Sequence, residues 1–251
     1  MTGTRANDAP SAGDATIHVA VKRKIFPPIG DREAQLVLSN VAFHVTPREF
    51  VVLTGPSGCG KSTLLNIIAG LDTDFEGNID LGSAGQRMTF IFQAPRLLPW
   101  RTVYENIVLA LPDNDPRLAK IPEMLARVGL TDAANAYPER ISLGMQRRAS
   151  LARGFILEPQ ILLMDEPFVS LDDPTAQSLR QLLMELVNRQ PTTVIFVTHD
   201  RAEAIQLATR ILRLSPGQAS VVQDIPVRLT SEQRRDRSAV LAEQTRIFGA
   251  G

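Results

Sequence analysis

The chain has 251 residues, of which 44% are hydrophobic and 22% are charged, the balance of a soluble globular protein. Its formal net charge is +0, which argues against a nucleic-acid partner and against a polybasic membrane anchor. A single cysteine excludes an internal disulfide framework, and no apolar run approaches the roughly 20 residues that a membrane-spanning helix needs.

The first part of the chain combines a polar leader with α/β patterning. Residues 1–15, "MTGTRANDAPSAGDA", contain no apolar core of a secretory signal, and their composition predicts disorder. Residues 35–45 and 48–55 alternate or cluster apolar side chains as strands do, and the second run leads directly into a glycine-rich turn. The segment "KSTLLNIIAGL" (61–71) then predicts a helix that ends near Gly70.

The middle of the chain, roughly 94–157, contains repeated prolines and helical segments without strand patterns, so we predict a helical subdomain inserted into the α/β core. Three later runs, "QILLMDE", "TTVIFVTHD" and "RILRLS", are typical of buried parallel strands. Residues 173–190 predict an amphipathic helix with Pro174 in its first turn. We therefore predict one domain over 16–229 and a short helical tail over 230–251.

The stretch "GPSGCGKST" fits the pattern G-x-x-x-x-G-K-[ST] between a strand and a helix. Its glycines let backbone N–H groups surround phosphate oxygens, and the helix N-terminus adds its positive dipole end. Lys61 is expected to reach the β- and γ-phosphates, and Ser62 to offer its hydroxyl to Mg²⁺. The Cys59 thiol, inside this loop, is expected to react with a thiol reagent unless nucleotide shields it. The predicted nucleotide contacts are Gly55, Pro56, Ser57, Gly58, Cys59, Gly60, Lys61, Ser62 and Thr63.

Polar residues follow three other predicted strands. Asp165 ends "ILLMD" and can hold Mg²⁺, and Glu166 can orient or deprotonate an attacking water. His199 follows "TTVIFVT", where it can polarise a γ-phosphate and hold the water in line. Gln93 ends "MTFIFQ", just before the helical insertion, where it can contact the metal or the water. A strand-end carboxylate or histidine alone indicates little, but the phosphate loop on the same sheet favours the nucleotide interpretation.

These motifs, in this order, resemble ATP-binding cassette (ABC) ATPases, and the resemblance covers nearly the whole chain after residue 15. It implies a P-loop NTPase of the α/β class, with a RecA-like mixed sheet, an N-terminal antiparallel β region and the inserted helical subdomain. It also implies ATP and Mg²⁺ as ligands. In this family "SLDD" (170–173) is the D-loop. Phe26, in "KRKIF", is a candidate for stacking on adenine, although a core phenylalanine is nearly as well supported.

In that family, the nucleotide lies between two protomers and meets a signature helix from the opposite one. Here "ISLGM" stands where the family has L-S-G-G-Q, and Ser142 and Gly144 retain the groups for phosphate contact. Leu143 replaces a glycine, so we expect a working but sterically altered site. The neighbouring Arg147 and Arg148 are expected to be solvated or paired within the cassette.

The pattern in "LLPWRTVYEN" is similar to importer ATPases of the nitrate, sulfonate and taurine group. Leu97, Leu98 and Trp100 form an apolar cluster that either meets a partner or packs within its own subdomain. The resemblance implies a homodimer, or pairing with a second cassette, and integral-membrane permease subunits. It also implies a periplasmic or extracellular solute-binding protein, and a peripheral position on the cytoplasmic face of the cell membrane. The competing interpretations are a soluble ABC protein of DNA repair or translation and a weakly hydrolysing regulatory ATPase.

Overall fold

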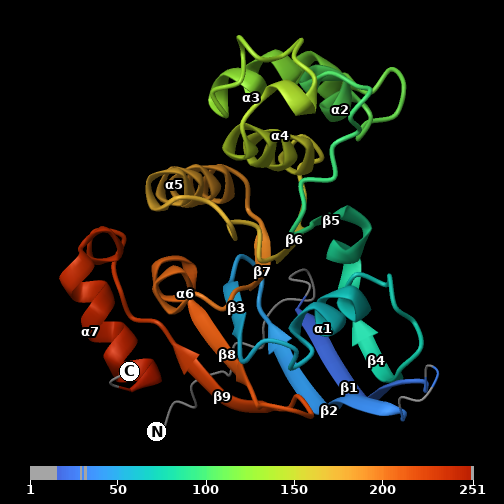
Figure 1. The fold of residues 1–251 in the computed structure, drawn as a ribbon, viewed down its shortest axis with the longest axis vertical. Coiled ribbons are helices and arrows are strands. Elements are labelled where there is room, and N and C mark those ends of the chain that lie inside the picture. Colours follow the sequence, from blue (N-terminus) through green and yellow to red (C-terminus); the bar gives the residue numbers. More distant parts are fainter. Residues whose placement is uncertain (1–15, 29, 31–32, 250–251) are drawn as a thin grey trace, which may run out of the picture.

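The computed structural model describes residues 16–28, 30 and 33–249, and the leader 1–15 lies outside them. The strands in this part of the chain form two sheets, one of three strands in the order β2-β1-β4 and one of six in the order β5-β6-β7-β3-β8-β9 (Figure 1). The strands are β1 Ile17–Phe26, β2 Gln35–Val45, β3 Phe50–Thr54, β4 Glu76–Asp80, β5 Met88–Ile91, β6 Ile161–Asp165, β7 Thr193–Val197, β8 Arg210–Leu214 and β9 Val221–Pro226.

The larger sheet is parallel from β5 to β8, and only β9 is antiparallel. Its central strand β3 puts Phe50 and Val52 into one hydrophobic cluster and Val51 and Leu53 into the other. Because both faces of a parallel sheet are buried, its strands consist of continuous apolar runs rather than alternating ones. The predicted buried parallel strands and the mixed α/β sheet are therefore confirmed.

The smaller sheet is antiparallel, and its middle strand β1 changes the face that it buries. Ile17, Val19 and Val21 are buried, which is the two-residue alternation of a half-buried strand. The next buried residue is Lys24, because irregular pairing with β4 after Val21 breaks the alternation. Such irregularities re-aim side chains, and this one turns Lys24 to the buried side of the sheet, while Phe26 at the end of the strand stays exposed.

Helices occupy the chain between β5 and β6, and Figure 1 shows α2, α3 and α4 gathered beyond the end of the sheet. The predicted limits of the insertion, 94 and 157, lie in the segments that join this group to the sheet. The helices are α1 Lys61–Ile68, α2 Val103–Val108, α3 Ile121–Arg127, α4 Leu143–Phe155, α5 Asp173–Arg189, α6 Arg201–Leu207 and α7 Arg237–Phe248, and short 3₁₀ turns cover Gly82–Arg87, Pro116–Lys120, Pro138–Arg140 and Gln233–Arg235.

Two predicted elements differ in their limits. The run "MTFIFQ" leaves the sheet at Ile91, so Gln93 lies two residues beyond the strand. The tail does not form one helix from Ser231, because Asp236 is extended and caps the N-terminus of α7 by accepting from the N–H of Ser238. No helix in the described part of the chain combines the length and the apolar character needed to cross a membrane.

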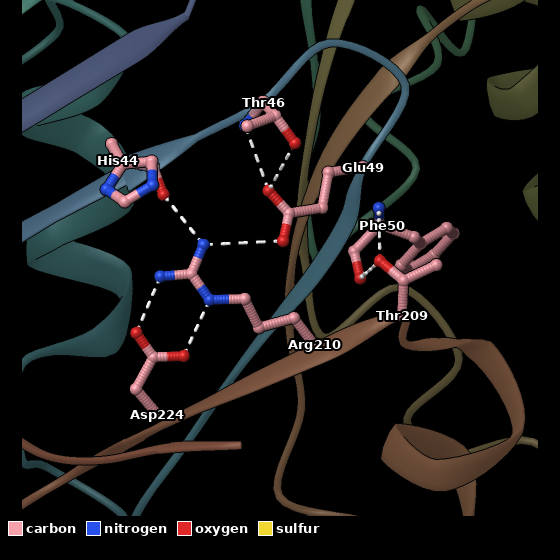
Figure 2. Close-up of polar contacts among 7 residues, drawn as sticks. All are labelled: His44, Thr46, Glu49, Phe50, Thr209, Arg210 and Asp224. Carbon is pink, nitrogen blue, oxygen red and sulfur yellow. Dashed lines mark hydrogen bonds and ion pairs between the residues drawn. The ribbon is translucent and has the colours of Figure 1, made fainter. Parts of the chain in front are cut away.

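A polar cluster joins the amino end of the larger sheet to its neighbours (Figure 2). Arg210 in β8 donates to both carboxylate oxygens of Asp224 in β9, each at 2.6 Å, and to the backbone oxygen of His44 at 2.9 Å. Its guanidinium also lies 3.3 Å from Glu49, which in turn accepts from the N–H and hydroxyl of Thr46. These contacts with Asp224 outweigh partial burial and raise the pKa of Arg210. The cluster fixes where β3 begins, and therefore where it delivers the loop at its other end.

Candidate functional site

The glycine-rich loop occupies the turn between β3 and α1, at the carboxyl end of the larger sheet. Gly60 adopts a φ of 103° as the N-cap of α1, and a Cβ there would lie 2.8 Å from the side chains of Val37 and Leu38. Only glycine fits this position, for both conformational and steric reasons. The ammonium of Lys61 lies inside the curl of the loop and donates to the carbonyls of Gly55 and Pro56, each at 2.9 Å. The lysine is 5% exposed, so the loop concentrates one positive charge at its centre.

The structure corrects the expectation for Cys59. Its side chain is 1% exposed and belongs to the hydrophobic cluster under α1. The thiol therefore faces the core, away from the side of the loop that can receive phosphate. Only the backbone of Cys59 can contribute to a nucleotide site, and rapid modification of its thiol is no longer expected.

Oxygen donors converge beside the loop. The hydroxyl of Ser62, in the first turn of α1, donates to Oδ1 of Asp165 at 3.0 Å. Burial raises the pKa of the Asp165 carboxyl, and the hydrogen bond from Ser62 opposes that shift. A hydroxyl and a carboxylate at one point are the hard oxygen donors that Mg²⁺ prefers, so these two residues fit that ion.

Glu166 and His199 form a second polar pair at the ends of β6 and β7. His199 Nδ1 lies 3.0 Å from Oε2 of Glu166. The backbone of Glu166 has a φ of 42°, in the left-handed region that is unfavourable for a residue with a long side chain, and its N–H donates to Val197. Strain of this kind, at the end of a buried strand, sets the direction of the carboxylate.

A hollow of about 400 Å³ brings most of the predicted residues together. Phe26, with 40% of its surface exposed, borders the same hollow as Gln93 and Glu166. The hollow is lined by Phe26, Gln35, Val37, Ser57, Gly58, Gly60, Lys61, Ser62, Thr63, Gln93 and Glu166. The arrangement can therefore hold a phosphate chain in the loop, with an aromatic ring and a carboxylate within the same space.

Ser142 and Gly144 do not line this hollow. Ser142 is the N-cap of α4, as predicted, and its hydroxyl accepts from the N–H of Met145 at 3.2 Å. A Cβ at Gly144 would lie 2.7 Å from the side chain of Thr175, so glycine is required there by packing within the chain. Leu143, between them, is 38% exposed. The start of this helix is thus open to a partner molecule.

Sequence reasoning missed how α4 holds the segment that follows β5. Arg147 is buried, donates to the backbone oxygen of Gln93, and is therefore paired rather than solvated. Arg153 donates to the backbone oxygens of Pro95 and Arg96, each at 2.8 Å. These two arginines fix the path of Gln93 from the helix that begins at Ser142. No spacing in the sequence identifies backbone carbonyls as partners, so only the fold reveals this link.

Comparisons with known proteins agree with this geometry. The family described as ABC transporter matches residues 38–169. The aliphatic sulfonates import ATP-binding protein SsuB 2 of Burkholderia cenocepacia is 40% identical over 248 residues, which cover 96% of this chain and 90% of that protein. SsuB of Bacillus subtilis, with the same description, is 38% identical and covers 92% of each chain.

Solved cassettes have the same fold. A dimeric structure of MJ0796, a bacterial ABC transporter cassette, superposes with a TM-score of 0.73 at 31% identity, covering 85% of this chain and all of that one. Its post-hydrolysis dimer with ADP and Pi gives 0.71 at 30% identity, with the same coverage. The phosphate loop, the acidic strand end and these similarities lead to one conclusion: this chain belongs to the ABC transporter family, as one of its nucleotide-binding cassettes.

Proposed function

We propose that this chain is the ATP-hydrolysing subunit of an importer for a small oxyanion or organosulfonate, with aliphatic sulfonates as the first substrates to test. The observation that carries the catalytic part is the convergence of Lys61, Ser62 and Glu166 on one hollow, with Asp165 bonded to Ser62. The substrate class rests on relatives described as aliphatic sulfonate import proteins that align over nearly the whole chain. The cassette is assigned to residues 16–229, with 230–251 as its tail.

The residues divide the chemistry among them. The loop from Gly55 to Thr63 holds the phosphates through its N–H groups, and Lys61 binds the β- and γ-phosphates. Ser62 and Asp165 would hold Mg²⁺, Gln93 is a further candidate to contact it, and the ion when bound would neutralise charge on the phosphate oxygens. Glu166 accepts the proton of the attacking water.

His199 has two tasks that its position supports. Its Nδ1 contact with Glu166 holds the carboxylate in one orientation. The opposite edge of the ring is then left to hydrogen-bond the γ-phosphate, because the histidine side chain is 53% exposed. Phe26, which borders the same hollow, stacks on the adenine base.

The open start of α4 supports a dimer. Ser142 and the N–H of Gly144 would meet the γ-phosphate bound by a second cassette, because helix N-termini attract anions. Leu143 would lie in that contact, which makes it the unusual feature of this protomer. The partner is a second copy of this chain or another cassette.

A separate surface suits a membrane permease. Trp100 is 68% exposed, whereas Leu97 packs against the large hydrophobic cluster and Leu98 is partly buried. Asn106, fully buried in α2, holds the turn that presents Trp100 by bonding both backbone groups of Leu98. The cassette would thereby lie on the cytoplasmic face of the cell membrane, with a solute-binding protein on the other side.

ATP hydrolysis by the assembled transporter and recovery of the permease together test this function. The complex purified from membranes should hydrolyse MgATP faster when an alkanesulfonate and its binding protein are supplied, and Lys61→Ala should remove that activity. Trp100→Ala should keep ATP binding but reduce recovery of the permease, since aromatic anchors contribute about 2 kcal/mol or more. Stimulation by nitrate and not by sulfonates would contradict the substrate class. ATP hydrolysis that no transported solute accelerates would contradict the importer itself.

A further inference from the structure

Phe26 is exposed and needs an anchor if it is to stack on a base. It ends β1 and does not belong to either hydrophobic cluster. It also borders a second hollow of about 610 Å³, lined in part by Leu71, Asp72 and Arg96, so open space lies on more than one side of the ring. Packing within the two hydrophobic clusters therefore does not select its rotamer.

Lys24 supplies a contact that apolar packing does not. Its ammonium lies 5.0 Å from the centroid of the Phe26 ring, within the range of a cation–π interaction. This contact brings the two side chains together even though the pairing of β1 with β2 is irregular between Lys24 and Ile25. The cation therefore covers the ring from within the protein.

The ammonium itself is held in place. Lys24 is 3% exposed and donates to Oδ1 of Asp72 at 2.9 Å and to the backbone oxygen of Asp74 at 2.6 Å. The carboxylate of Asp74 lies 3.3 Å away. Burial alone would lower the pKa of Lys24, but the bonds to Asp72 and Asp74 outweigh it and raise the pKa. The residue thus stays charged, and its ammonium contacts the Asp72 carboxylate and both the backbone and the carboxylate of Asp74.

We propose that Lys24 is a positioning residue for nucleobase binding, which anchors the Phe26 ring through its ammonium while Asp72 and Asp74 fix the ammonium. The inference rests on the proposed function, since it requires Phe26 to receive the base of ATP. Lys24 contacts no phosphate, because it does not line the hollow formed by the loop. Its effect must therefore depend on whether the ligand carries a base.

Two ligands separate the base from the phosphates. Isothermal titration calorimetry of the full chain should measure Kd for ATP and for inorganic tripolyphosphate, which has no base. Lys24→Met nearly keeps the length of the side chain and removes its charge. It should raise the Kd for ATP about three- to tenfold, the range of a partly desolvated cation–π contact. The Kd for tripolyphosphate should not change. Lys24→Arg should restore ATP affinity, because a guanidinium can also lie on the ring.

Matched variants connect the effect to Phe26. Lys22→Met makes the same chemical change on an exposed residue of the same strand, and should bind both ligands normally. Phe26→Ala should weaken ATP at least as much as Lys24→Met, and adding Lys24→Met to it should cause no further loss. If Lys24→Met does not fold, Asp72→Asn releases one partner of the ammonium and should give a smaller loss specific to ATP.

Several results would overturn the proposal. Equal losses for ATP and tripolyphosphate would mean that Lys24 supports the loop and not the ring. Losses that add in the double variant would separate Lys24 from Phe26. Normal ATP binding by a folded Lys24→Met or Asp72→Asn protein would remove the role altogether. If the wild-type chain bound neither ligand, the nucleotide function would fail first, a result distinct from all of these.

Discussion

The two ends of the larger sheet treat their polar groups differently. At the amino end, Arg210 is bonded to Asp224, Glu49 and the backbone of His44, and every contact is between partners that fold together (Figure 2). At the carboxyl end, Glu166 is held at a φ of 42°, and Ser170 follows at 64°. The amino end also holds left-handed residues, Arg48 at a φ of 64° and Glu158 at 52°, so the two ends differ in how their charged groups are paired and not in backbone strain.

Buried side-chain atoms without a partner among the described residues occur at both ends, for example Oε1 of Gln190 before β7, whereas the pKa shifts of the carboxyl groups differ between the ends. Thr54, the last residue of β3 before the phosphate loop, has a buried hydroxyl with no hydrogen-bond partner among the described residues. Burial raises the pKa of Asp165 on β6, two strands from β3, whereas Arg210 lowers the pKa of Asp224 at the opposite end. Burial of a carboxylate without a cation bonded to it costs free energy, so the carboxyl end gives up stability at Asp165 to keep this group ready for a ligand. This contrast predicts which substitutions affect turnover and which affect folding.

The largest effect is expected from Glu166→Gln. The amide cannot accept the proton of the attacking water, so kcat should fall by about 10²–10⁴ while ATP affinity stays the same. An ATP-bound dimer should then accumulate, which size-exclusion chromatography with light scattering detects. Glu49→Gln makes the same change at the amino end and should lower the melting temperature without altering kcat. Wild-type turnover by Glu166→Gln would remove this carboxylate from the mechanism.

Arg210→Met should have the opposite signature. The substitution leaves two carboxylates without their cation. Because Asp224 is half-exposed, we expect the free energy of unfolding to fall by about 2 kcal/mol, less than for a fully buried pair. Urea unfolding measures this loss, and ATP affinity should be unchanged. The control is Arg213→Met in the same strand, which loses only a bond to Gln223 and should be nearly neutral. A large drop in ATP affinity would mean that the two ends are coupled.

The third prediction uses pH to separate the two ends. The pKa of Asp165 is raised in the folded chain, so its contribution to stability is complete below the ordinary value of 3.8 and is lost as pH rises through the folded pKa. Asp165→Asn, neutral throughout, should therefore melt higher than wild type at pH 7, and the difference in melting temperature should close in acid. Asp224→Asn should melt lower at pH 7, because a lowered pKa stabilises only above 3.8. If both variants melted higher than wild type at pH 7, or both melted lower, the proposed difference between the two ends of the sheet would be wrong.

Much of this arrangement could be predicted from sequence because it is local. The run at 35–45 matches β2 residue for residue, and the loop before Lys61 has its glycines where positive φ or close contact requires them. Strand-end residues such as Asp165 and His199 could be placed together because the carboxyl ends of parallel strands share one edge.

The parts that sequence could not supply depend on contacts between distant segments. The burial of Cys59 comes from the packing of α1 on the sheet, which the loop pattern does not contain. The Arg147 and Arg153 bonds end on backbone carbonyls, which any sequence would offer. Lys24 looks like an exposed strand residue until an irregular pairing turns it inward. In each case the missing information is three-dimensional.

The smallest expected effect concerns Leu143, where the two neighbouring positions differ instructively. At Gly144 a side chain would collide with Thr175 of the same chain, so the glycine is required before any partner binds. Leu143 is the first residue of α4 and is exposed, so its own chain places no such demand on it. Any constraint at Leu143 must therefore come from the closed dimer.

Two effects oppose each other when Leu143 becomes glycine. The helix start loses up to about 1 kcal/mol of propensity, which should lower the melting temperature slightly. The closed dimer gains room for the backbone to approach the opposite nucleotide. Because closure of the dimer completes the catalytic site, we expect the steric gain to dominate. Steady-state ATPase activity should rise several-fold, which corresponds to a barrier lower by about 1 kcal/mol. The affinity of the monomer for ATP should not change. The ATPase activity of Leu143→Ala should lie between those of the wild type and Leu143→Gly, because alanine keeps a Cβ but loses the bulk of leucine. Alanine also has a better helix propensity than glycine. Equal or lower activity in the glycine variant, measured on the assembled transporter or on concentrated subunit, would mean that the dimer accommodates the leucine and uses it.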